Sequence, residues 1–186
     1  MNNKYKIIKE EHKWTSEEKI KFCGYGEWVE ELDFIEFEYK GYRATVIRRL
    51  LKEPCAEEEC WFGGHLCGYV KIPNEYPPFE EEEIDLECHG GITFEGIMDE
   101  EHWIGFDCGH AGDLIPTMMQ HFKNDNLVFN TFQKLLIETN PFSKFPALNH
   151  IYRNMNYCTE ECMKIIDWLR EREINPQSSP RNYLYE

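Results

Sequence analysis

The sequence predicts an α+β protein, with an antiparallel sheet of about five or six strands and helices packed on it. Segments with the alternating pattern of strands come first, and segments with helical periodicity fill the last third of the chain. The length of 186 residues suits a single domain. We expect a sheet-rich core over 33–116, a helical part over 117–174 and a tail over 175–186.

The composition limits the functional classes. With 41% hydrophobic and 15% aromatic residues, the chain can bury a substantial core and is not disordered by composition. The net charge of −15 argues against a nucleic-acid binder, which would carry a basic face. It leaves an acidic solvated surface or an acidic mimic of DNA. The sequence has neither an apolar run near the roughly 20 residues of a membrane span nor a signal peptide, so a cytoplasmic location is expected.

A short helix is predicted within the otherwise polar segment 1–32. Thr15 can cap its first turn, where two glutamates also suit the positive end of a helix. Gly24 and Gly26 are expected to end it.

A β-hairpin is predicted over 33–49. Ile35 and Phe37 share one face of its first strand, and glutamates alternate with them. Lys40-Gly41 suits a two-residue turn. The returning strand carries three arginines, which we interpret as solubilising charges at a strand edge, with an anion contact as the alternative: Arg43, Arg48 and Arg49.

Further strands are predicted beyond an acidic loop over 50–64. His65 and Cys67 should point to one face, because side chains alternate along a strand. These strands cover 65–73, 84–88, 91–95 and 103–108.

The last third of the chain is predicted to be helical. Asp113 can cap the first of these helices and Thr159 the last, which ends with basic residues. Cys158 and Cys162 lie four apart on one helix face and are assigned to the core. The expected helices cover 114–123, 127–139 and 159–173.

The segment Cys88–Asp113 concentrates reactive side chains among glycines. His89 and His110 lie in glycine-flanked turns at strand ends. Because histidine titrates near neutral pH, the pair can share general acid and base roles, with Asp107 orienting one ring. A structural Asp–His hydrogen bond that fixes the loop is an equally weighted alternative.

The same segment predicts a site for an anion. The sequence Gly109–Asp113 joins a strand to a helix, whose first N–H groups can bind a phosphate or carboxylate, although Asp113 already brings a negative charge there. Tyr69, Trp103 and Phe94 can stack on a base, with core packing as the alternative. The predicted ligand-binding residues are His65, Tyr69, Gly90, Gly91, Gly109, Gly112 and Asp113.

No metal or other cofactor is predicted. The eight cysteines should be thiols in a reducing cytosol, and their spacings lack the close C-x2-C pairs of structural zinc sites. Cys108 lies in the apolar run WIGFDC, which argues against a Cys–His nucleophile. Zinc remains a weak alternative, with the candidate ligands Cys55, Cys60, His65, Cys67, Cys88, His89, Cys108 and His110.

The stretches HLCGYVKIP, CHGGITFEG and WIGFDCGHAGD resemble motifs of a family of small phage and prophage proteins. The family patterns are W/H-x-C-GYV-x-VP, DVHGGLTF and WW-x-GFDC-A-HAGD, and the likeness covers about residues 34–116. Glu87-Cys88 replaces Asp-Val of the family and Gly109 replaces its Ala, which argues against Cys88 as a required metal ligand. The matching residues are His65, Gly68, Tyr69, His89, Gly90, Gly91, Asp107, Cys108, His110, Gly112 and Asp113.

The resemblance implies a phage accessory role in the host cytoplasm, including interference with host defence, and brings no activity with it. The leading expectation is a protein that binds a small anionic, nucleotide-like ligand between its HGG and GHAGD loops and sequesters a host defence signal. One alternative is a hydrolase of a phosphodiester or glycosidic bond that uses His89 and His110. Another is an acidic interaction protein or DNA mimic. Neither nucleic acid nor a membrane is expected as a partner, and homo-oligomerisation stays open.

Overall fold

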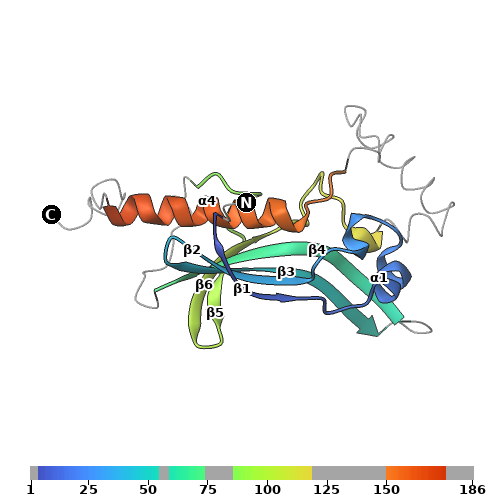
Figure 1. Cartoon of the computed structure of the whole chain (residues 1–186). Coiled ribbons are helices and arrows are strands. Elements are labelled where there is room, and N and C mark those ends of the chain that lie inside the picture. The colour runs from blue at the N-terminus through green and yellow to red at the C-terminus, as the bar shows by residue number, and fades with distance from the viewer. Residues whose placement is uncertain (1–3, 55–58, 74–85, 119–149, 175–186) are drawn as a thin grey trace, which may run out of the picture.

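A six-stranded antiparallel sheet forms the body of the protein, and α4 (Met155–Ile174) lies across one of its faces (Figure 1). The computed structural model describes residues 4–54, 59–73, 86–118 and 150–174. The strand order is β1-β2-β3-β4-β6-β5, which confirms the predicted α+β class. The strands are β1 (Lys6–Glu11), β2 (Phe34–Tyr39), β3 (Tyr42–Pro54), β4 (Glu59–Ile72), β5 (Phe94–Met98) and β6 (Glu101–Asp107).

The main core lies between the sheet and α4. Alternate residues of the central strands point toward the helix, as Phe37 and Val70 do, while Tyr69 and Trp103 pack together on the other face. Gly68 lets the helix approach closely, because a Cβ there would lie 2.7 Å from Cys162 Sγ. The helix buries Cys158, Cys162, Ile165, Ile166 and Leu169. Cys158 and Cys162 are therefore core residues, as predicted.

The predicted hairpin is confirmed. β2 pairs with β3 from Phe34↔Ile47 to Tyr39↔Tyr42. Lys40 and Gly41 both have positive φ, at 49° and 86°, which gives the two-residue turn the backbone twist that a hairpin needs.

The predicted loop over 50–64 is wrong for most of its length. β3 continues to Pro54 and pairs with β4, which begins at Glu59. The register shifts between Arg49 and Leu50, opposite the positive-φ residues Gly63 and Gly64. The described parts of this segment, 50–54 and 59–64, therefore belong to a long strand pair.

Two more strand predictions need correction. Residues 86–88 form no strand, and β5 begins only at Phe94, because Gly91 N donates to Cys88 O across a tight turn. Residues 84 and 85 lie outside the described residues. The strand predicted over Trp103–Cys108 is confirmed as part of β6, which ends one residue earlier, at Asp107. β1 was not expected; its residues are mostly exposed, so no buried face marks it in the sequence.

The N-terminal helix is confirmed as α1 (Ser16–Cys23). Thr15 caps it in a capping box with Glu18, and Gly24 ends it. A single turn, η1 (Glu27–Val29), follows.

α4 begins earlier than predicted. The Asn154 side chain caps it by accepting from Tyr157 N at 3.0 Å. Thr159 is buried inside the helix and donates to Met155 O at 2.8 Å, so it is not the cap. The helix expected from Leu114 begins at Pro116, and only its residues up to Met118 are described. The expected helix over 127–139 and the tail over 175–186 lie outside the described residues. No helix in the described ranges is both long and apolar enough to cross a membrane.

Arg48 corrects the interpretation of the hairpin arginines as surface charges. Its side chain is 1% exposed and is fully engaged inside the protein. Its Nε donates to Asp33 Oδ1 at 2.6 Å, and its Nη atoms donate to Glu31, Tyr152 and the carbonyl of Gly64, each at 2.8 Å. Burial alone would lower the pKa of Arg48, but Tyr152, Asp33 and Glu31 together raise the pKa above its ordinary value.

Lys19 belongs to the same buried network. Its Nζ lies 3.0 Å from Asp33 Oδ1 and donates to Glu31 O at 2.5 Å. Asp33 also accepts the backbone N–H groups of Lys13 and Trp14. Two cations and two carboxylates are therefore held together beneath α1.

We predict that Arg48→Ala lowers the free energy of unfolding by about 3–5 kcal/mol, because it leaves buried carboxylates without their partner. Arg43→Ala is the matched control. That arginine is in the same strand and pairs with Glu36 and Glu101, but its side chain is 36% exposed, so its loss should cost at most about 1 kcal/mol. Urea unfolding followed by tryptophan fluorescence measures both. Equal losses in the two variants would contradict this view of Arg48.

Candidate functional site

The HGG and GHAGD loops meet beside the start of α4. The first is the turn Cys88–Gly91 before β5, and the second follows the end of β6. The rings of His89 and His110 lie with their centroids 5.4 Å apart. Gly90 makes this contact achievable, because a Cβ at that position would lie 2.3 Å from His110 Cε1. The structure therefore brings together the two histidines that the sequence singled out.

Asp113 is the centre of this site. Its Oδ2 lies 2.7 Å from His89 Nε2 in a hydrogen bond and accepts the His110 N–H at 3.1 Å. Its Oδ1 accepts from Arg153 Nε at 3.0 Å. The backbone of Asp113 forms a parallel bridge with Ile151, just before α4. The expected role of Asp113 as a helix cap is thus wrong, since the carboxylate serves the two loops instead.

Residues of α4 and the segment before it complete the site. The Tyr157 hydroxyl lies 2.9 Å from His89 Nδ1, and Glu161 accepts the backbone N–H of His89 at 2.9 Å. The Arg153 guanidinium stacks on the Tyr157 ring at 4.8 Å. Sequence reasoning missed all three residues. The spacing of four between Tyr157 and Glu161 is the one signal, since it places these two residues on a common helix face.

His110 is the more accessible histidine. Its side chain is 35% exposed, whereas that of His89 is 10% exposed. His110 Nδ1 lies 3.8 Å from Asp113 Oδ2 and has no hydrogen-bond partner among the described residues. His89 has both ring nitrogens engaged, by Tyr157 and by Asp113. A molecule that enters the site would therefore meet His110.

Asp107 does not orient either histidine through a hydrogen bond in the described structure. Its carboxylate accepts from Thr93 Oγ1 and from Gly109 N, both at 2.9 Å. Burial would raise its pKa, but these two hydrogen bonds and the charges of His110 and His65 lower the pKa below its ordinary value. Of these two carboxylates, Asp113 is the one that hydrogen-bonds a histidine ring, that of His89.

His65 lies close to these residues but bonds to none of them. It shares the sheet face of Cys67, as predicted, and a Cβ on Gly109 would lie 3.5 Å from its Nε2. Burial lowers the pKa of His65, against the opposing charges of Asp107 and Asp113. His65 is therefore neutral at pH 7.

Three of the backbone donors in the two loops are already engaged within the protein. Gly91 N donates to Cys88 O, Gly109 N donates to Asp107 and His110 N donates to Asp113. Gly91 and Gly112, with φ of 83° and 96°, have open space where a Cβ would be, so they shape the turns. These three N–H groups are therefore not available to an anion.

Tyr69 lies away from the histidines. It is on the sheet face opposite α4, where its hydroxyl accepts from Arg49 at 2.9 Å and its ring packs edge-on against Phe94. With Trp103 it lines a cavity of about 470 Å³ on that face. The single pocket expected from the sequence is thus divided between the two sides of the sheet.

The cysteines are core thiols. Cys108 Sγ lies 3.5 Å from Cys158 Sγ, and this contact together with burial raises the pKa of Cys108 well above its ordinary value. Burial raises the pKa of Cys67 and of Cys88 to about 11. A thiol that stays protonated at neutral pH is a poor nucleophile, because the thiolate is the reactive form. Cys55 and the side chain of Cys60 lie outside the described residues.

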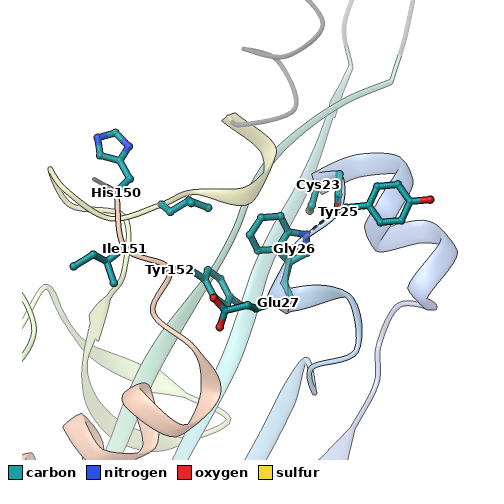
Figure 2. A pocket seen from close by; sticks show the side chains of 10 residues that line it. Cys23, Tyr25, Gly26, Glu27, His150, Ile151 and Tyr152 are labelled. Carbon is teal, nitrogen blue, oxygen red and sulfur yellow. Dashed lines mark hydrogen bonds between the residues drawn. The ribbon is translucent and has the colours of Figure 1, made fainter. Parts of the chain in front are cut away.

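A second cavity, of about 500 Å³, lies between the α1–η1 segment and residues 150–152 (Figure 2). Figure 2 shows Tyr152 and Glu27 along its wall, with the Tyr25 ring and the His150 imidazole directed outward. Burial raises the pKa of Cys23 in its lining to about 11, so this thiol stays protonated at neutral pH. The cavity brings together no acid–base pair among the described residues, and the histidine site remains the better candidate.

Comparison of the chain with protein-family models, with curated proteins and with solved structures finds no match.

We predict that Gly90→Ala displaces His110, because the added Cβ would overlap the imidazole and the φ of 65° is strained for alanine. Gly91→Ala is the matched control, with a similar φ of 83° and no atom within 4 Å. Gly90→Ala should cost at least about 1 kcal/mol more stability than the control. It should also shift the His110 ring resonances in NMR spectra. Unchanged His110 resonances in Gly90→Ala would refute the contact.

We predict that His65 makes the fold sensitive to mild acid. Burial lowers the folded-state pKa of His65 below the unfolded value of about 6.5. The contribution of His65 to the free energy of unfolding is therefore present above pH 6.5 and is lost as the pH falls through the folded-state pKa. Urea unfolding at pH 7.5 and 5.5 should show a smaller loss of stability for His65→Gln than for the wild type. The exposed residue His12 gives the control, and His12→Gln should match the wild type. The same loss in all three proteins would rule out His65 as the cause.

Proposed function

We propose that the protein binds a small anionic, nucleotide-like ligand at the junction of the HGG and GHAGD loops, and so sequesters it. The observation that carries this proposal is the convergence of His89, His110 and Arg153 on one buried carboxylate, Asp113. The convergence holds basic side chains at one point of an otherwise acidic protein. Preorganised cationic donors of this kind favour phosphate and carboxylate groups.

Arg153 supports recognition of a phosphate. Its Nε is bound to Asp113, and among the described residues no carboxylate pairs with its terminal Nη atoms. Its side chain is 25% exposed, and the contact with Tyr157 fixes the guanidinium plane. The Nη atoms can therefore donate to an incoming phosphate in the forked geometry that arginine provides.

His110 supplies the second contact. Its ring lies beside the HGG turn, and its 35% exposure leaves one edge open to solvent. A histidine that gains an anionic partner favours its protonated form, which adds a charge-assisted hydrogen bond. We therefore assign initial contact with the ligand to His110 and Arg153, and the support of both to Asp113.

Hydrolysis of a phosphodiester or glycosidic bond is the second candidate. It is favoured by the position of His110 Nδ1, 3.8 Å from the buried carboxylate of Asp113. A carboxylate on one ring nitrogen orients the imidazole and stabilises its protonated form, which leaves the other nitrogen to act as a general acid or base. In this mechanism Asp113 is the orienting residue and His110 exchanges the proton with the substrate.

We predict that a nucleotide, a cyclic dinucleotide or an ADP-ribose derivative raises the melting temperature of the protein. His110→Ala and Arg153→Ala should each weaken that binding by roughly ten-fold or more, because each removes a charge-assisted hydrogen bond worth about 1.5–3 kcal/mol. His12→Ala removes an exposed histidine outside the site and should bind as the wild type does. Thermal shifts across the panel and mass spectrometry of ligand released from purified protein provide the measurement.

No shift with any member of the panel and no co-purified anion would refute the binding proposal. Long incubation with stoichiometric protein then separates the two candidates. A ligand that returns unchanged indicates sequestration. Turnover that His110→Ala abolishes, with binding retained, indicates hydrolysis.

A further inference from the structure

We propose that His89, His110 and Asp113 form a binding site for a transition-metal dication such as Zn²⁺. Each side chain offers one ligand atom, and these atoms all lie within 4.8 Å of one another. Two imidazoles and one carboxylate form a donor set that proteins use for catalytic zinc and for related dications, whereas Mg²⁺ and Ca²⁺ prefer oxygen ligands throughout.

The surroundings of the three ligands already have the form of a metal site. Tyr157 engages His89 Nδ1, which turns Nε2 of that ring toward Asp113. Arg153 binds Asp113 Oδ1, whereas His89 Nε2 binds the other oxygen, Oδ2. Ligating histidines and carboxylates are typically held by such partners, which fix the ring orientation.

His110 Nδ1 gives an independent indication. This nitrogen is buried and has no hydrogen-bond partner among the described residues. Buried polar atoms in proteins nearly always have a partner. A dication between His110 Nδ1, His89 Nε2 and Asp113 Oδ2 would satisfy it, and it would replace the proton that now joins His89 to Asp113 at 2.7 Å.

Metal binding requires both imidazoles to adjust their distances to Asp113. Tetrahedral ligand atoms at the usual zinc distances lie about 3.3 Å apart. The His110 Nδ1 to Asp113 Oδ2 distance of 3.8 Å must shorten slightly, and the His89 to Asp113 distance must lengthen. His110 is the most accessible of the three ligands, with 35% of its side chain exposed, and its other side packs against Gly90.

The site is closed on the protein side and open toward solvent. The side chain of Asp113 is 2% exposed and that of His89 is 10% exposed, against 35% for His110. Three protein ligands leave a fourth position for water or another molecule, as in catalytic zinc sites. A dication bound by one carboxylate carries a net positive charge, so the fourth coordination position would attract an anion. The attraction of an anion rests on the proposed function, whereas metal binding itself does not. Arg153 is bound to the same carboxylate and repels the cation. The affinity for the dication should therefore be lower than that of a structural zinc site.

The test is calorimetric titration of Zn²⁺ into the full chain after treatment with a chelator, together with the absorption spectrum of the Co²⁺ form. We expect one Zn²⁺ per chain and a cobalt spectrum without a thiolate charge-transfer band, since no cysteine is a ligand. His110→Ala should weaken Zn²⁺ binding at least 100-fold. Tyr157→Phe, which keeps the three ligands and removes only the hydroxyl that positions His89, should weaken it about 10- to 100-fold. His12→Ala should bind as the wild type does.

Equal Zn²⁺ affinity in the wild type and His110→Ala, no saturable binding, or a thiolate band would each overturn the proposal. Circular dichroism of each variant establishes that it is folded. The two proposals fail separately: nucleotide binding that persists in chelator without Zn²⁺ binding refutes only the metal site, and Zn²⁺ binding without any thermal shift from the nucleotide panel refutes only the ligand.

Discussion

The rest of the structure depends on the hydrogen bonds and ion pairs of the buried Arg48 guanidinium. Its hydrogen bonds reach the segment before β2, the bulge in β4 and Tyr152 ahead of α4. Glu31, one of its partners, also accepts from Met155 N at 2.6 Å and so neutralises the positive end of α4. A buried cation is tolerated only when all these partners are in place, because an unpaired charge costs several kcal/mol. The network therefore fixes where α4 begins.

The position of α4 in turn determines the histidine site. The helix and the residues before it bring Arg153, Tyr157 and Glu161 to loops that are distant in sequence. Asp113 joins these groups, since one carboxylate serves both histidines and the arginine. Electrostatics at the site are thus set by one buried negative charge surrounded by groups that can carry positive charge. An ion, whether a cation or an anion, is better accommodated among these polar groups than in the apolar core nearby.

The sequence predicts local features well and distant partners poorly. The hairpin at Lys40-Gly41 and the capping box at Thr15 depend on neighbouring residues, and both are confirmed. Arg48 was assigned to the surface because its partners lie 15 to 104 positions away, beyond any local pattern. The proximity of His89 and His110 followed from their glycine-flanked turns. The hydrogen bond of His89 to Asp113 and not to Asp107 did not, since it depends on how the two loops meet in the folded protein.

The bridge between Asp113 and Ile151 joins two parts of the chain that are distant in sequence. Leu114 N donates to Ile151 O and Ile151 N donates to Gly112 O, both at 3.0 Å, so the polypeptide leaves this point and returns to it beside the histidines. The entropy of closing a loop grows only slowly with its length. These two hydrogen bonds can therefore hold Gly112 and Ile151 together beside the histidines at little additional entropic cost from the number of residues between them.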